Sequence, residues 1–168
     1  EDTAREFLRS LALGEREVLS EAVIERTMEL AGWPIPYHLQ VLFANLQVHQ
    51  RDTGRDATVD DVDAVFEALL KQHVIFDSWH ERLSLELGEP AASQANLLLS
   101  ACAADPHGAS RDVLDTRLSA KIVDVDQRTR ELRYLLDVLE HDGYLREANE
   151  RYAFRSNLLR EFWKRRYA

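Results

Sequence analysis

The sequence has little cysteine and no long apolar run. Its 168 residues include one cysteine, Cys102, so no disulfide can form within the chain. Cys102 lies in the apolar run 97–103, which indicates a small buried side chain rather than a nucleophile. No apolar run approaches the roughly 20 residues of a membrane-spanning helix, and no signal-peptide pattern opens the chain. We expect a cytoplasmic protein, in a reducing compartment, without membrane contact.

Motifs for phosphate and metal binding are also missing. The chain has no Gly-x-x-x-x-Gly-Lys-Ser/Thr loop and no strand followed by paired acidic residues that could hold magnesium. The histidines of the first half lack the spacing of a structural zinc site, and one cysteine cannot complete such a site. These histidines are His38, His49, His73 and His80. We therefore expect no metal, no cofactor and no ATP hydrolysis in this chain by itself.

Charge is abundant and unevenly distributed along the chain. The net charge is -9. Residues 1–90 carry 8 basic and 18 acidic side chains, a net charge of -10, whereas residues 91–168 carry 13 basic and 12 acidic side chains, a net charge of +1. Such a change in composition predicts two domains, 1–89 and 90–168.

Apolar residues of the first domain recur at helical spacing, and no strand-like alternation appears. Thr58 followed by Asp61 resembles a capping box with a short acid, which would open a helix. The expected helices cover 2–13, 20–31, 36–53, 58–70 and 74–87. The first domain is therefore predicted to be an all-α bundle.

The second domain has a different pattern. Two short alternating runs surround the polar turn at 149–150, and this arrangement predicts a β-hairpin. Helices are expected over 91–104, from Ser110 to Leu118, over 126–141 and from Asn157 onward. Three helices followed by a hairpin is the winged-helix plan. The predicted fold class is mainly α, an all-α helical lid bundle followed by a winged-helix domain with a small β-hairpin.

Two prolines form a corner in the first domain. Gly32 can adopt positive φ and end the preceding helix, and Pro34 and Pro36 fix the backbone before the next one. A tight helix–corner–helix is the structural interpretation of this stretch. Gly32-Trp33-Pro34 also resembles the Gly-x-Pro signature in the helical lid of STAND-type and archaeal-type AAA+ ATPases. In that superfamily the corner lies against the base and sugar of the nucleotide.

The second domain extends this resemblance over nearly the whole chain. The runs 135–145 and 152–163 resemble the C-terminal winged helix of the same ATPases, with the corner upstream in the same order. The resemblance implies a regulatory lid plus winged helix, closing over ATP or ADP with Mg held by an ATPase core domain in cis. It also implies a relay of nucleotide state to a partner protein through the winged helix. Because the chain begins with Glu1, we expect it to be a fragment of such an ATPase.

The resemblance further implies a phosphate sensor after the wing. In related STAND proteins a histidine there reaches the bound diphosphate, and the matching position here is Ser156, next to Arg155. Both residues are candidate phosphate sensors. A strand-end arginine at the surface is the alternative interpretation of Arg155.

The winged-helix plan raises DNA binding as an alternative function. The arginines suited to phosphate or base-edge contacts are Arg128, Arg130, Arg133, Arg146 and Arg151. Acidic residues are interleaved with them, and the overall negative charge disfavours a polyanion. A solvated helix face is the structural interpretation of these arginines. A protein–protein interaction scaffold that binds neither nucleotide nor DNA is the third hypothesis.

Overall fold

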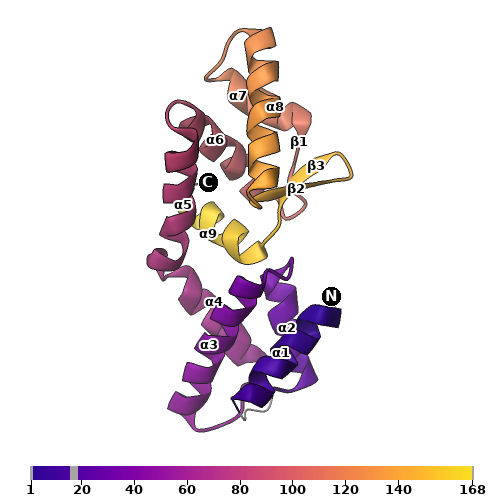
Figure 1. Ribbon diagram of the computed structural model, residues 1–168, viewed down its shortest axis with the longest axis vertical. Helices are drawn as coiled ribbons and strands as arrows, with labels where there is room; N and C mark the ends of the chain where they lie inside the picture. The colour runs from indigo at the N-terminus through magenta and orange to yellow at the C-terminus, as the bar shows by residue number, and fades with distance from the viewer. Residues whose placement is uncertain (1, 16–18, 168) are drawn as a thin grey trace. The chain divides into compact units, whose positions relative to one another are not determined.

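The computed structural model describes the backbone of residues 2–15 and 19–167, and the side chains of these residues except 73–75. Within this part of the chain the protein is mainly α-helical with one small antiparallel sheet, which confirms the predicted class (Figure 1). The chain forms two compact units. Unit 1 runs to Gln72 and includes Ser156–Leu158, and unit 2 comprises His73–Arg155 and the residues from Leu159 onward.

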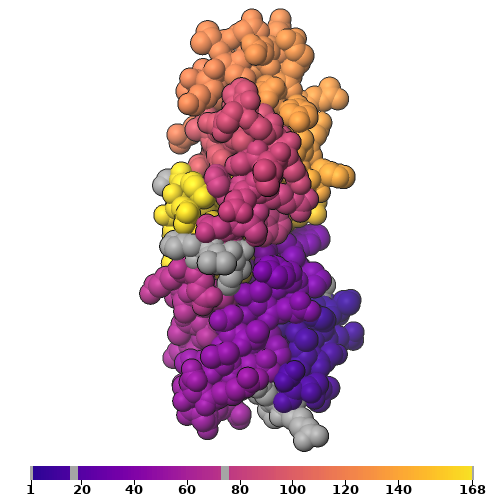
Figure 2. Space-filling model, turned by 60° about the vertical axis from the view of Figure 1, so that its left-hand side comes forward, coloured from indigo at the N-terminus to yellow at the C-terminus, as the bar shows by residue number. Residues whose placement is uncertain are grey.

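Unit 1 is a helical bundle whose apolar faces meet. Its helices are α1 (Asp2–Gly14), α2 (Glu21–Ala31), α3 (Pro36–Thr53) and α4 (Val59–Leu70). Figure 2 shows α1 in indigo beside the purple surface of α3. The inward side chains, each at most 1% exposed, include Leu8, Ile24, Leu39, Leu42, Leu46 and Leu69. These positions are the helical-period apolar residues of the sequence, so burial of one face explains the bundle.

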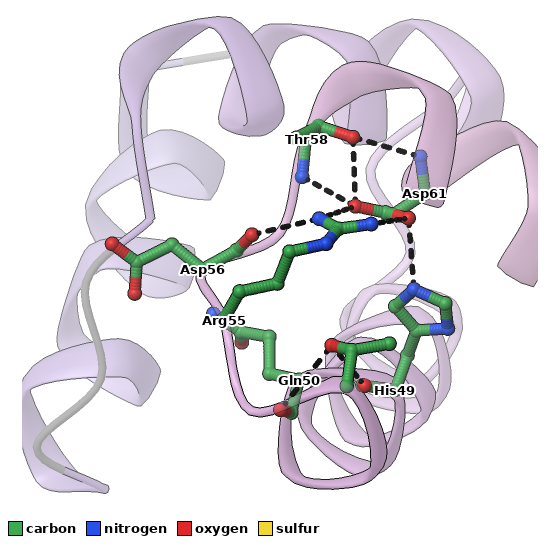
Figure 3. A network of polar contacts seen from close by, with 7 residues as sticks. His49, Gln50, Arg55, Asp56, Thr58 and Asp61 are labelled. Atoms are coloured by element: carbon green, nitrogen blue, oxygen red, sulfur yellow. Dashed lines mark hydrogen bonds and ion pairs between the residues drawn. The ribbon is translucent and has the colours of Figure 1, made fainter.

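A polar network around Asp61 joins the start of α4 to the end of α3 (Figure 3). The Thr58 backbone N–H donates to Asp61 Oδ2 at 2.8 Å and Asp61 N donates to Thr58 Oγ1 at 3.4 Å, which confirms the predicted capping box. Arg55 Nη1 lies 2.6 Å from Asp61 Oδ2, and His49 Nε2 lies 2.8 Å from Asp61 Oδ1. The Arg55 guanidinium and then the Thr58 donors hold the pKa of the Asp61 carboxyl well below its usual range.

Unit 2 combines helices with the sheet. Its elements are α5 (His73–Leu87), α6 (Ala91–Ala103), β1 (Ala109–Ser110), α7 (Arg111–Ser119), α8 (Val125–His141), β2 (Leu145–Ala148), β3 (Arg151–Phe154) and most of α9 (Asn157–Tyr167). Strands β2 and β3 form the predicted hairpin, and Figure 1 shows it beside the end of α8. The short strand β1 adds to β3 and gives the order β1-β3-β2, which the sequence analysis did not predict.

Gly108 permits this third strand. Its φ is 75°, and a Cβ at this position would lie 2.0 Å from Tyr152 O. Any side chain would therefore collide with the backbone of β3, and a positive φ is strained for other residues. Glycine is what allows the chain to bring Ala109 against Tyr152 in the sheet.

The core of unit 2 is rich in aromatic rings. Phe76 of α5 stacks on Phe162 of α9 with centroids 4.5 Å apart, and Trp79 meets Tyr144 edge-to-face at 5.1 Å. The Tyr144 hydroxyl donates to Trp79 O at 2.6 Å. Trp163 has no exposed surface. These contacts group α5 with unit 2, so the division lies between residues 72 and 73 rather than 89 and 90. The predicted boundary rested on the distribution of charge along the chain, and this distribution does not depend on which side chains pack together.

Candidate functional site

The Gly32–Pro34 corner is a tight turn between α2 and α3. Gly32 ends α2 with φ 74°, and its N–H donates to Met28 O at 3.0 Å. The Ile35 N–H donates to Trp33 O at 2.8 Å, so the turn closes over Pro34. Pro36 then occupies the first turn of α3, as predicted from its missing N–H.

The segment after β3 packs directly against this corner within unit 1. Gly32 and Ser156 form an isolated antiparallel bridge, and Asn157 Nδ2 donates to Leu30 O at 3.0 Å. A Cβ on Gly32 would lie 3.0 Å from Asn157 N. Glycine is therefore needed twice, for its positive φ and for the close approach of the second backbone. The residues predicted for the lid corner and for the sensor position are brought together by this bridge.

The corner presents an aromatic surface to solvent. The side chain of Trp33 is 51% exposed and that of Tyr37 is 50% exposed, while Pro34 is half-buried. The ring of His38 lies 5.8 Å from that of Tyr37, centroid to centroid; His38 is 1% exposed, and burial lowers the pKa of its imidazole to about 4. His38 is thus neutral at pH 7 and adds no charge beside Tyr37. An apolar, uncharged face of this kind is suited to stacking on a planar ring.

The two candidate sensors have different surroundings. Ser156 lies at the corner and has no exposed surface. Arg155 is half-buried in unit 2, where its Nε donates to Leu145 O at 3.0 Å and its Nη2 to Glu140 O at 3.3 Å. The Arg155 side chain thereby ties the end of α8 to β2. Only Ser156 of the pair reaches the corner.

Sequence reasoning missed Tyr37 and Asn157 as parts of the corner. Tyr37 could have been identified from the sequence, because it follows Pro36 directly and therefore lies in the first turn of α3, next to the corner. Asn157 gave none, because its contact with Leu30 joins residues that are far apart in the sequence. Such a contact follows only from the fold.

Two of the five arginines proposed for DNA contacts hold loops of unit 2. Arg128 donates to Asp115 Oδ1 at 3.0 Å and to Ile122 O at 3.1 Å. Arg151 donates to Asp105 Oδ2 at 3.1 Å and to the carbonyl groups of His107 and Gly108. These guanidinium groups donate hydrogen bonds to backbone carbonyls of the loops.

The other three arginines, Arg130, Arg133 and Arg146, are exposed. The described residues contain no group of three histidine, cysteine, aspartate or glutamate side chains arranged to hold a metal ion. Among the helices described, none has the length and apolar character required to cross a membrane.

Comparison with known proteins bears on the fold. A scan against protein-family models and a search of curated proteins gave no match. Among solved structures the chain is similar to a Walker-type ATPase of Pyrococcus abyssi, with a TM-score of 0.64 and 19% sequence identity over 98% of this chain. The match spans 41% of that protein, so the chain covers less than half of its length. At this identity the likeness shows a shared fold.

Proposed function

We propose that this chain is the regulatory lid and winged-helix portion of a P-loop ATPase. In this proposal unit 1 is the helical lid and unit 2 is the winged helix. The lid closes over ATP or ADP, with Mg, held by an ATPase core domain in cis. The observation that carries the proposal is the exposed Trp33–Pro34 corner, whose Gly32 is paired with Ser156 immediately after β3.

The corner supplies binding to the base and no phosphate chemistry. Trp33 offers an exposed indole face and Pro34 a rigid apolar ring, and base–aromatic stacking contributes about 1–3 kcal/mol per base. The chain lacks a Walker loop, so the groups that hold phosphate and magnesium belong to the core domain. The chain by itself is therefore proposed to be no enzyme, and hydrolysis is assigned to the longer protein.

The pairing of Gly32 with Ser156 supplies a route for regulation. Nucleotide contacts that stabilise one conformation of the corner also bias the backbone at Ser156, which follows Arg155 and the wing directly. A partner protein that binds the winged helix differently in the two states then senses the nucleotide. The coupling requires that nucleotide contacts differ between the states.

Nucleotide retention by the longer protein tests the proposal. Replacing Trp33 by alanine removes the stacking surface, and we expect ADP to dissociate about tenfold faster, in line with the energy of one stacked base. Pro34→Ala should have a smaller effect of the same sign. Val48→Ala changes another exposed apolar residue of unit 1 and serves as the matched control. If Trp33→Ala, Val48→Ala and the unchanged protein all retain ADP equally well, the corner has only a structural role.

The isolated chain provides a second test. Purified residues 1–168 should show no ATP turnover above background and weak or no nucleotide binding, because the phosphate-binding groups lie elsewhere. Turnover that disappears when one residue of this chain is replaced would contradict the proposal.

DNA binding is the weaker candidate. Arg128 and Arg151 are engaged by Asp115 and Asp105, and a net charge of -9 repels phosphates. A salt titration with a DNA duplex decides the matter. Steeply salt-dependent binding that is lost with Arg130→Ala and Arg133→Ala would favour the DNA function. Co-purification of a partner that responds to neither nucleotide nor DNA would favour a scaffold.

A further inference from the structure

The outward face of α3 in unit 1 carries no charge until its last turn. The sequence from Glu29 to Arg51 contains 21 intervening residues without a charged side chain, although charged residues make up 30% of the chain. The other helices of unit 1 all expose charges to solvent, such as Glu6 on α1, Glu25 on α2 and Glu67 on α4. Depletion of charge on one exposed face is typical of the core of a protein–protein interface.

An apolar stripe runs along this uncharged face. Tyr37 is 50% exposed and Val48 is 52% exposed, and between them Ala44 is exposed and Val41 is half-buried. The four residues follow one another at intervals of four, three and four, which places them on one side of the helix. This is also the spacing of the contact positions where two helices pack along each other. Helix α3 therefore has the surface of a helix that packs against another one.

A groove of about 380 Å³ lies beside the middle of the stripe, between α1 and α3. Its lining residues are Ser10, Leu11, Gly14, Glu15, Gln40, Phe43, Ala44 and Gln47. Ala44 thus belongs to both the stripe and the groove. Because Gly14 has no side chain and Ala44 only a methyl group, the groove is open at this point to a side chain of a helix packed on the stripe.

The stripe is complementary to itself when a second copy runs antiparallel. Its four positions are spaced symmetrically about the point midway between Val41 and Ala44. A reversed copy therefore brings Tyr37 against Val48 of the second copy, and Val41 against Ala44 of the second copy. Each pair combines a larger with a smaller side chain, so the two helix axes keep an even separation along the stripe. A two-fold axis makes both copies use the same residues.

The distribution of charge in unit 1 favours the same pairing. Residues 1–72 carry 14 acidic and 7 basic side chains, a net charge of -7. Two copies that met through the acidic faces of α2 or α4 would place like charges opposite each other, which is costly. The stripe of α3 contains no carboxylate that could pair with a basic partner either. An uncharged, self-complementary face is suited to a second copy of itself.

We propose that two copies of this chain pair through the stripe of α3, antiparallel about a two-fold axis. Val41 of each copy enters the groove beside Ala44 of the other. Four stripe residues per copy form a small interface, so the dimer is weak, with a Kd of about 100 µM. The pairing requires no nucleotide and no contact of Trp33, so it is independent of the proposed function.

Sedimentation of the full 168-residue chain without nucleotide tests the pairing. Between about 10 µM and about 1 mM the chain should change from mainly monomer to mainly dimer, as the expected Kd requires. A chain that stays monomeric at 1 mM overturns the inference, and the stripe then belongs to another segment of the longer protein or to another protein.

NMR of the unchanged protein tests the antiparallel arrangement. Tyr37 and Val48 are about 16 Å apart along one helix, because 11 residues rise about 1.5 Å each. A nuclear Overhauser effect between the Tyr37 ring and the Val48 methyl groups can therefore arise only between two copies. A sample that mixes two differently labelled batches of the chain should show it at 1 mM. A dimer without this signal would contradict the proposed pairing.

A charge at the centre of the stripe should prevent pairing. Ala44→Glu obstructs the groove and places two carboxylates near the two-fold axis, so dimerisation should weaken more than about tenfold. Ala64→Glu adds the same charge at an exposed position of α4 and should change the Kd less than twofold. Equal weakening by the two variants would show general repulsion between acidic chains and contradict the inference.

Loss of an apolar contact provides a variant without added charge. Val48→Ser removes apolar area from both ends of the paired stripes and should weaken dimerisation about fivefold. Leu13→Ser, at a 77% exposed residue of α1, is its control and should leave the Kd unchanged. Equal Kd values for the two variants would contradict the pairing. If Ala44→Glu does not fold, Val48→Ser and the signal between copies still decide the inference.

Discussion

The two units bury different kinds of side chain. Unit 1 encloses an imidazole, His38, and a carboxylate, Asp61, among its aliphatic residues. Unit 2 encloses a group of aromatic rings, with Phe76 stacked on Phe162 and Trp163 fully buried. Ionisable groups respond to pH and aromatic packing does not. We therefore expect acid to loosen unit 1 more than unit 2.

The pKa shifts of carboxyl and imidazole groups share one direction in unit 1 and differ in direction in unit 2. Burial lowers the pKa of His38 to about 4, and hydrogen bonds from Arg55 and Thr58 lower the pKa of Asp61. In unit 2 a hydrogen bond from Arg82 lowers the pKa of Glu86, whereas burial and then the neighbouring Glu86 raise the pKa of Asp142. Lowered values in unit 1 mean that the unfolded chain binds more protons there as the pH falls, which destabilises the fold. In unit 2 the lowered pKa of Glu86 and the raised pKa of Asp142 affect the stability in opposite directions.

The largest expected effect is the loss of an aromatic ring from unit 2. Trp163→Ala should reduce the free energy of unfolding by about 3–5 kcal/mol, the usual cost of truncating a buried aromatic residue. Hydrogen exchange should show the loss of protection mainly in α5, α6 and α8. Tyr134→Ala, at a side chain that is 51% exposed, is the control and should leave protection unchanged. An equal loss of protection in α1 and α4 would show that the two units do not differ in their dependence on the aromatic core.

Acid should act on unit 1. Between pH 7 and pH 4 the protonation of His38 in the unfolded chain should lower the free energy of unfolding of unit 1 by up to about 3 kcal/mol. This contribution is complete above pH 6.5 and is lost as the pH falls toward about 4. Hydrogen exchange at several pH values, corrected for intrinsic rates, measures it in α2–α4. His38→Leu should flatten the pH dependence, whereas His107→Leu in unit 2 should not. A steeper decline in unit 2 would contradict the assignment.

A smaller effect is expected for the capping network. Asp61→Ala removes the carboxylate half of the capping box and leaves the Thr58 N–H and Arg55 without their acceptor, at a cost of about 2 kcal/mol to unit 1. Urea unfolding of the variant measures this loss. Asp60→Ala, at the exposed neighbouring position, should change the midpoint little. A midpoint for Asp61→Ala equal to that of Asp60→Ala would show that the network does not stabilise the unit.

Local patterns in the sequence were sufficient to predict the helices. Ser20, Thr58 and Ser110 each accept a backbone N–H at the start of a helix, and each of them precedes an apolar periodic run. The hairpin followed from two alternating runs around a turn with positive φ at Asn149 and Glu150. These features depend on neighbours in the chain, and so the sequence contains them directly.

Long-range contacts could not be predicted in the same way. The strand β1 is two residues long and pairs with a strand more than 40 residues away, so periodicity gave no signal. The binding of Arg151 to Asp105 and the contact of Asn157 with Leu30 likewise join distant segments. Gly32 and the two prolines identified the corner in the sequence, and the resemblance implied its contact with a nucleotide. Only the fold brings Ser156 beside them.

The most direct test of the account uses fluorine NMR of the tryptophans. The chain has three, with Trp33 in unit 1 and Trp79 and Trp163 in unit 2, and Trp33→Phe assigns the first signal. With 5-fluorotryptophan in the longer protein, ADP should move the Trp33 signal and leave the other two nearly unchanged. The isolated chain should show no change. A Trp33 signal that stays in place while ADP is demonstrably bound would contradict the proposal that this corner covers the nucleotide.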